Sequence, residues 1–206
     1  MSKSKCNKTI KLILFYFLSC TWGILTTLSG AIVAFALIIT GHRPKKFGSC
    51  WCFPMTDNWG LELGLFFITN KKMSKYLGCH EVGHQLQTCM FGPLQIFLVT
   101  IPSAIRFNLR NIKSYKNKQK FTTLFSVISF TVCLAMIILH VMLNQIWFSI
   151  LVICIMTYLS CLSIWLGTET ERYETIPYPR YDDCWFEGDA TKRGIYFINK
   201  YYPEEI

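Results

Sequence analysis

The stretch Gly78–Gln87 reads GCHEVGHQLQ and contains His80, Glu81 and His84 in the order H-E-x-x-H. On an α-helix, side chains four positions apart lie on one face, so His80 and His84 can bind one metal ion together. This spacing favours Zn²⁺, and it places Glu81 within reach of a water molecule on the metal. Zinc lowers the pKa of such a water towards about 7, and we expect Glu81 to take its proton as the general base.

Residues on either side of the motif predict the helix that carries it. Leu77 and Leu86 supply apolar positions, and Gly92-Pro93 predicts the end of the helix. Gly83 lies inside the motif, where glycine costs about 1 kcal/mol relative to alanine, so we expect it to allow another element to approach closely. The alternative is a helix with two buried or solvated histidines and no metal.

The composition indicates a membrane protein of mainly α fold class. The chain has 206 residues, of which 52% are hydrophobic and 16% aromatic, and this is too apolar for an ordinary soluble domain. Its net charge of +9 is concentrated beside apolar runs: residues 3–11 contain four lysines, and residues 106–120 contain six basic residues and no acid. Such basic flanks are typical of the cytoplasmic side of membrane helices, so we expect the lipid bilayer as a partner and exclude nucleic acid.

Two long apolar runs predict a transmembrane helical hairpin. Phe121–Leu143 and Ile146–Leu166 are each long enough to cross the hydrocarbon core, and Asn144-Gln145 predicts the turn between them. A hairpin returns the chain to the side from which it started, so the basic linker and the tail share one compartment. The excess of positive charge predicts that this compartment is the cytoplasm, with the protein in the cell membrane as a multi-pass protein.

Two further apolar runs are harder to place in the membrane. Leu12–Thr40 contains no charge and predicts an uncleaved span, with a cleaved signal peptide and a helical hairpin bent near Gly23 or Gly30 as alternatives. Pro93–Phe107 is short and interrupted by Pro102, which favours a re-entrant or partly spanning segment.

A short β element is predicted just before the motif. His42–Trp59 contains two prolines and several aromatic residues and is interpreted as a loop, whereas Leu61–Thr69 is interpreted as one strand. The free edge of this strand can pair with the extended backbone of a substrate by strand addition, or the strand can be purely structural. The ten cysteines do not settle the redox compartment: several lie in apolar runs, and Cys50 and Cys52 are too close in sequence for the usual redox or zinc motif.

Two histidines do not complete a catalytic zinc site, which ordinarily has three protein ligands and one open position. The tail offers Glu187 in a second predicted helix that begins near Asp183. We expect Trp185 and Phe186 to anchor this helix in the core, and the small side chain of Ala190 to let it pack near the first helix. A solvent-exposed helix glutamate is the alternative interpretation of Glu187.

Together these residues resemble the gluzincin metalloproteases, in which H-E-x-x-H on one helix pairs with E-x-x-A-D or E-x-x-x-D on a later one. Among the integral-membrane members, the sequence is similar to the HtpX-like and BlaR-like peptidases. It is closer still to small uncharacterised membrane proteins that look alike in four short blocks, within residues 60–194: LGLFFI, HEVGHQLQ, GPL followed by IPS, and WFEGDAT. The resemblance implies a zinc site with His80, His84 and Glu187 as ligands and Glu81 as general base.

The sequence departs from this pattern at one position. Thr191 stands where E-x-x-x-D members have an aspartate that orients a zinc-bound histidine, and Asp189 is displaced to another helix face. Partners of metal ligands change affinity and activity by about 10–100-fold, so this departure predicts a weakened site or another orienting residue. Four residues of the tail are candidates for stabilising an oxyanion, with a structural role as the alternative for each: Tyr178, Arg180, Tyr181 and Arg193.

We expect four segments: an N-terminal transmembrane segment, a loop with strand, motif helix and re-entrant segment, a basic linker with the helical hairpin, and a tail with the third-ligand helix. They span residues 1–41, 42–110, 111–167 and 168–206. The predicted function is that of a membrane-embedded zinc metallopeptidase that hydrolyses peptide or protein substrates, with its zinc site at the cytoplasmic face. A non-catalytic membrane scaffold or interaction protein with a structural zinc site is the alternative.

Overall fold

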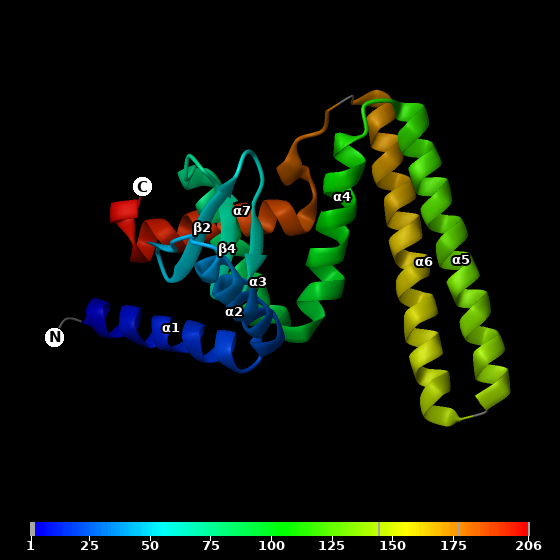
Figure 1. The fold of residues 1–206 in the computed structure, drawn as a ribbon, viewed down its shortest axis with the longest axis horizontal. Coiled ribbons are helices and arrows are strands. Elements are labelled where there is room, and N and C mark those ends of the chain that lie inside the picture. The colour runs from blue at the N-terminus through cyan, green and yellow to red at the C-terminus, as the bar shows by residue number, and fades with distance from the viewer. Residues whose placement is uncertain (1–2, 144, 177, 206) are drawn as a thin grey trace. The chain divides into compact units, whose positions relative to one another are not determined.

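A computed structural model of the protein describes residues 3–143, 145–176 and 178–205 (Figure 1). The chain is 76% helical, and its described residues form seven α-helices and a small sheet. They form two compact units. The first comprises residues 1–100 and 181–206, and the second comprises residues 101–180. The mainly helical fold with a short β element is thus as predicted.

The first unit begins with two helices rather than one straight span. Helix α1 (Lys3–Cys20) and helix α2 (Ile24–Ile39) are bent by 81° at the break between them. Gly23 lies in this break, and a Cβ there would lie 2.7 Å from the Thr88 side chain, so the turn packs tightly on the motif helix. The Thr27 hydroxyl donates to Ser19 O at 2.8 Å and ties α2 back to α1. The run is thus bent near Gly23, at one of the two expected positions, but by 81° rather than folded back into a hairpin.

A four-stranded sheet follows, in the order β1-β2-β4-β3. Strand β2 pairs with β4 in parallel, while β1 and β3 pair with their neighbours in antiparallel fashion. The bounds are β1 (Lys45–Phe47), β2 (Cys50–Thr56), β3 (Leu61–Leu63) and β4 (Phe66–Asn70).

Two predictions for this region were wrong. The segment His42–Trp59 contains strands β1 and β2 and is not a loop. The predicted single strand Leu61–Thr69 is a hairpin, because Gly64 adopts a positive φ of 70° and reverses the chain between β3 and β4. A glycine in an alternating apolar run therefore marks a turn here, and it moves β3 to the edge of the sheet.

Helix α3 (Lys75–Phe91) carries the motif and packs along helix α7 (Trp185–Tyr201). A Cβ on Gly83 would lie 2.8 Å from Ala190 Cα and closer still to the Ala190 carbonyl. The expected close approach at Gly83 is thus confirmed, with α7 as the approaching element. Phe186 is buried as expected, but Trp185 is 57% exposed and does not anchor α7 in the core.

The core of the first unit lies between these two helices, α1 and the sheet. It contains buried side chains from all of them, and Cys79 on α3 packs in it as an apolar residue. These core residues are Phe15, Phe47, Cys50, Cys52, Phe67, Cys79, Val82, Phe197, Ile198 and Tyr201.

The second unit consists of helix α4 (Ile101–Asn111), helix α5 (Tyr115–Leu143) and helix α6 (Ile146–Thr175). Helices α5 and α6 pack against each other and are long and apolar enough to cross a membrane. Of their predicted turn, Asn144 lies outside the described residues. Arg106 on α4 is fully buried and donates to Glu169 Oε1 at 2.7 Å, so not every basic residue of the predicted membrane flank faces solvent.

Short helices join the two units along the chain. After α3 ends at Phe91, η1 (Gly92–Leu94) and the π-helical η2 (Ile96–Thr100) lead into α4. Two bent pairs of helices are long and apolar enough to cross a membrane when each pair is taken together: residues 75–94 with 96–111, and residues 8–20 with 24–39. Each pair fits a broken span or a re-entrant loop. At the C-terminal end, η3 (Tyr181–Asp183) precedes α7 and η4 (Pro203–Glu205) follows it.

Candidate metal centre

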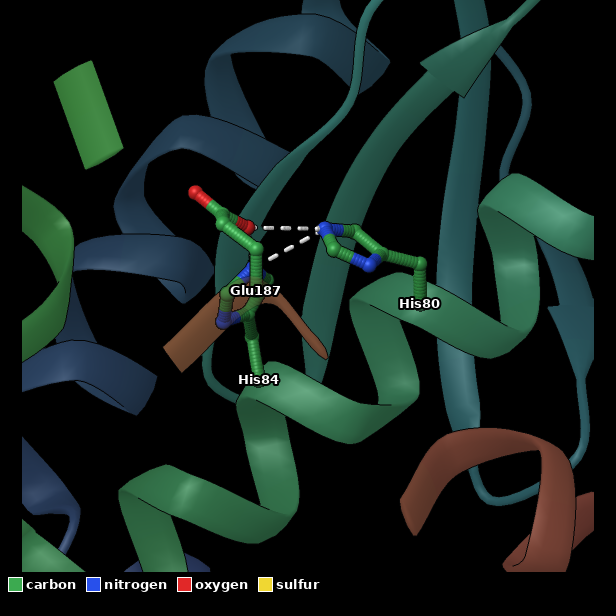
Figure 2. Close-up of side chains that lie close together, drawn as sticks. All are labelled: His80, His84 and Glu187. Carbon is green, nitrogen blue, oxygen red and sulfur yellow. Dashed lines mark hydrogen bonds and ion pairs between the residues drawn. The ribbon is translucent and has the colours of Figure 1, made fainter. Parts of the chain in front are cut away.

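Three side chains from two helices converge within the first unit (Figure 2). His80 and His84 lie on successive turns of α3, and Glu187 lies in the first turn of α7. The two Nε2 atoms are 3.1 Å apart, and Glu187 Oε2 is 3.2 Å from His80 Nε2 and 3.1 Å from His84 Nε2. All three residues are buried, with Glu187 fully inaccessible. The structure therefore brings together the three residues predicted to bind a metal.

The neighbours of the two imidazoles determine which nitrogen carries a proton. Gln87 Nε2 donates to Phe186 O at 2.8 Å and to Asp189 Oδ2 at 3.0 Å, so its Oε1 is left as the acceptor that faces His84 Nδ1 at 2.9 Å. The Thr191 hydroxyl donates to Asp182 Oδ1 at 2.9 Å, so its oxygen accepts from His80 Nδ1 at 2.8 Å.

Both rings therefore carry hydrogen on Nδ1 and turn Nε2 towards the centre of the cluster, where it can offer a lone pair to a metal ion. Two Nε2 atoms and a carboxylate oxygen at about 3 Å repel one another unless a proton or a metal cation lies between them.

The donor set fits a zinc ion. Zinc ligands lie about 2.0–2.1 Å from the metal, so tetrahedral coordination places two of them about 3.3 Å apart. The three observed separations of 3.1, 3.1 and 3.2 Å are close to this value. Two neutral imidazoles and one carboxylate are also a common ligand set of catalytic zinc sites. A buried group of this composition can thus hold a metal ion.

The pKa values of the three side chains also indicate that the cluster is stabilised by a positive charge. Burial alone would raise the pKa of Glu187, but hydrogen bonds with His80 and His84 hold it well below its usual range. Burial works against a charged His84, yet the hydrogen bond with Glu187 and the charges of Glu187 and Glu81 raise its pKa. Burial lowers the pKa of His80. One proton is therefore retained among the three groups, and a metal cation would displace it on binding.

Glu81 lies on α3 next to His80 and is buried, at 4% exposure. Its carboxylate packs against Gly60, where a Cβ would lie 2.7 Å from Glu81 Cδ and closer to Oε1. Burial raises the pKa of Glu81 to about 8, and the nearby His84 partly opposes this increase. Gly60 thus leaves room for the predicted base on the side of the β2–β3 loop.

A second buried carboxylate, that of Glu62 on β3, forms hydrogen bonds with side chains of the motif helix α3. It accepts hydrogen bonds from Gly64 N at 2.7 Å and from Thr88 Oγ1 at 3.1 Å. Gln85 Nε2 donates to Glu62 Oε1 at 2.6 Å when its amide is oriented to satisfy all its neighbours, and Ser19 then donates to Gln85. Burial raises the pKa of Glu62 to about 7. These contacts link α1, α3 and the edge strand.

Other residues considered from the sequence lie in different surroundings. The Tyr181 ring centroid is 5.8 Å from that of His80, which makes Tyr181 the candidate oxyanion residue nearest the cluster within this unit. Arg193 pairs with Asp189 on the surface of α7. Tyr178 and Arg180 belong to the second unit.

Sequence reasoning missed two residues around the imidazoles, Gln87 and Asp182. Gln87 stands three positions after His84, which is a helical neighbour spacing and was a usable signal. Asp182 reaches His80 only through Thr191, and no spacing rule predicts such an arrangement.

Comparisons with known proteins found no match. No protein-family model fits the chain, and no curated protein or solved structure is significantly similar to it. The likeness to gluzincins therefore stays a prediction from short sequence blocks, and the function rests on the geometry of this site.

Proposed function

We propose that the protein is a membrane-embedded zinc metallopeptidase. The observation that carries this proposal is the convergence of His80 Nε2, His84 Nε2 and Glu187 Oε2 within 3.2 Å, with both imidazole tautomers set by neighbouring side chains. Three protein ligands of this kind leave a fourth zinc position open for water or substrate. The H-E-x-x-H order then supplies Glu81 beside the metal.

Each residue has a defined role in the proposed reaction. His80, His84 and Glu187 bind the metal, and Thr191 and Gln87 hold the rings in the tautomer that can do so. Bound zinc supplies Lewis-acid polarisation of the scissile carbonyl and makes a water more acidic. Glu81 accepts the proton of the attacking water and passes it to the departing amine. Strand β3 ends the sheet order, so its outer edge is suited to pair with an extended substrate backbone.

The proposed location follows from the two long apolar helices. Helices α5 and α6 are each long and apolar enough to cross a membrane, and little of either apolar surface is buried. Such surfaces are suited to lipid, and the basic residues before α5 predict a cytoplasmic start for the hairpin. Because α6 returns the chain to that side, the segment with Glu187 is proposed to lie at the cytoplasmic face of the cell membrane.

The test is peptide hydrolysis by the purified full-length chain in detergent or liposomes, with Glu81→Gln as the decisive variant. Loss of the general base lowers hydrolysis on the order of 100- to 10,000-fold, while the zinc content stays near that of the wild type. Glu171→Gln, which removes an exposed carboxylate on α6, is the matched control and retains activity. Full activity in Glu81→Gln contradicts the assigned mechanism.

Burial of the site favours a second candidate, a scaffold with a structural zinc ion. His80, His84 and Glu187 are all buried, and structural zinc sites are closed. This candidate requires a fourth protein ligand. It predicts that chelation lowers the melting temperature and that a zinc-loaded wild type cleaves no member of a diverse peptide panel.

A further inference from the structure

Thr191 stands at the position where the E-x-x-x-D pattern has an aspartate. Its side chain nevertheless contacts His80 of the metal centre. Its hydroxyl oxygen lies 2.8 Å from His80 Nδ1 and donates to Asp182 Oδ1 at 2.9 Å. Asp182 belongs to η3, nine residues before Thr191 and outside α7. A carboxylate thus reaches His80 from a different element, with one hydroxyl group between them.

Asp182 is held in place from two sides. Tyr76 of α3 donates its hydroxyl to Asp182 Oδ2 at 2.5 Å. Gly188 lets η3 approach α7 closely, since a Cβ there would overlap the carbonyl oxygen of Asp182. Both of these hydrogen-bond donors, Tyr76 and Thr191, are neutral hydroxyls, so they orient the carboxylate without cancelling its charge.

The partner of the other histidine differs in this respect. Asp189 reaches His84 through Gln87, but both of its oxygens lie 2.7 Å from Arg193 Nε. The guanidinium offsets the charge of Asp189. Of these two aspartates, Asp182 is therefore the stronger source of negative potential near the histidines.

We propose that Asp182 is a positioning residue of the metal centre that acts on His80 through Thr191. This inference rests on the proposed metal site. Because the Thr191 hydroxyl donates to Asp182, it can only accept from His80 Nδ1, which fixes the ring orientation and leaves the Nε2 lone pair for the metal. The negative charge also makes the imidazole a better donor to a cation. The Thr191–Asp182 pair therefore replaces a direct aspartate.

Four variants of the full-length protein test this role: Thr191→Val, Thr191→Ser, Asp182→Asn and Asp183→Asn. Valine matches threonine in shape but lacks the hydroxyl, and serine retains it. Asp183 is exposed on the same short helix, so its substitution controls for loss of a nearby charge. Zinc affinity is measured by competition with a chelator. Separately, ¹⁵N NMR of metal-free protein at a pH of about 8, above the usual histidine pKa, reports the tautomer of His80.

Thr191→Val and Asp182→Asn are expected to lose about 10- to 100-fold in zinc affinity, whereas Thr191→Ser and Asp183→Asn stay near the wild type. In the NMR measurement, His80 carries its proton on Nδ1 in the wild type and shifts towards Nε2 in Thr191→Val. A merely structural threonine would lower the melting temperature of the metal-free protein without changing this tautomer. If Thr191→Val does not fold, Asp182→Asn makes the same test.

The outcomes separate this inference from the proposed function. A wild type that binds zinc with an affinity unchanged in Asp182→Asn and Thr191→Val overturns the role of Asp182 and leaves the metal site standing. A wild type that binds no zinc overturns the proposed function. A His80 protonated on Nε2 in the wild type overturns the role of Asp182 whatever the metal content.

Discussion

The close packing of α3 on α7 yields the sharpest structural prediction, for the substitution Gly83→Ala. A Cβ on residue 83 would lie 1.8 Å from the Ala190 carbonyl oxygen, whereas real Cβ atoms essentially never lie within 3.0 Å of another heavy atom. The two helices must therefore separate at this contact by at least the difference, 1.2 Å. Overpacking costs about 1–3 kcal/mol, and an overlap with backbone atoms belongs at the upper end, about 3 kcal/mol. The better helix propensity of alanine returns about 1 kcal/mol, so we expect a net loss of about 2 kcal/mol in the free energy of unfolding.

The same displacement has a larger effect on the metal site. Glu187 lies on α7 and the two histidines on α3, so any separation of the helices moves the carboxylate away from the imidazoles. Metal–ligand distances tolerate deviations of about 0.2 Å, well below the expected shift. We therefore expect the zinc affinity to fall by at least about 100-fold, which is the upper end for changes that touch only the partners of ligands.

The assay compares melting temperature and zinc affinity in wild type, Gly83→Ala and Gly167→Ala. Gly167 lies within α6 with nothing within 4 Å of an added Cβ, so its substitution controls for the change in helix propensity. Gly167→Ala is expected to leave zinc affinity unchanged and stability equal or slightly raised. Wild-type zinc affinity in a folded Gly83→Ala protein would refute the inference that this helix contact sets the ligand geometry.

Two further predictions concern buried carboxylates. In Gly60→Ala, the added Cβ presses on the Glu81 carboxylate, so peptidase activity falls while zinc content, measured by mass spectrometry, is retained; loss of the metal would contradict this. The pKa of Glu62 is raised by burial to about 7 from an ordinary value of 4.5, so Glu62 stabilises the fold below pH 4.5 relative to neutral pH, and this contribution is lost as the pH rises through about 7. Melting curves of metal-free Glu62→Gln should show a smaller loss of stability over that range than the wild type, and an identical loss would contradict the assignment.

Much of the site could be predicted because its residues lie on helices with local signals. The H-E-x-x-H spacing places two imidazoles on one face by helix geometry alone, and Gly83 indicated a close neighbour. Glu187 stood out because it opens a second apolar helix in the tail. These inferences need only the periodicity of a single helix and the ligand requirements of zinc.

The sheet and the residues around the ligands could not be predicted in the same way. Strand β1 has three residues, and β2 contains Pro54, so neither shows the alternation that identifies a strand. Thr191 is a departure from the expected aspartate in sequence alone. Its hydrogen bond to Asp182 could not be predicted, because Asp182 lies on another element. Contacts of this type depend on the tertiary packing of η3 on α7, which no local pattern encodes.

Two imidazoles and one carboxylate are proposed to bind a zinc ion in this protein. X-ray absorption spectroscopy of the purified protein, with the zinc content determined on the same sample, tests this coordination. We predict about one zinc per chain with only nitrogen and oxygen neighbours at about 2.0–2.1 Å, and loss of the metal in His84→Ala and Glu187→Ala. A wild type without zinc, or a sulfur shell at about 2.3 Å from the chain's cysteines, would contradict the claim.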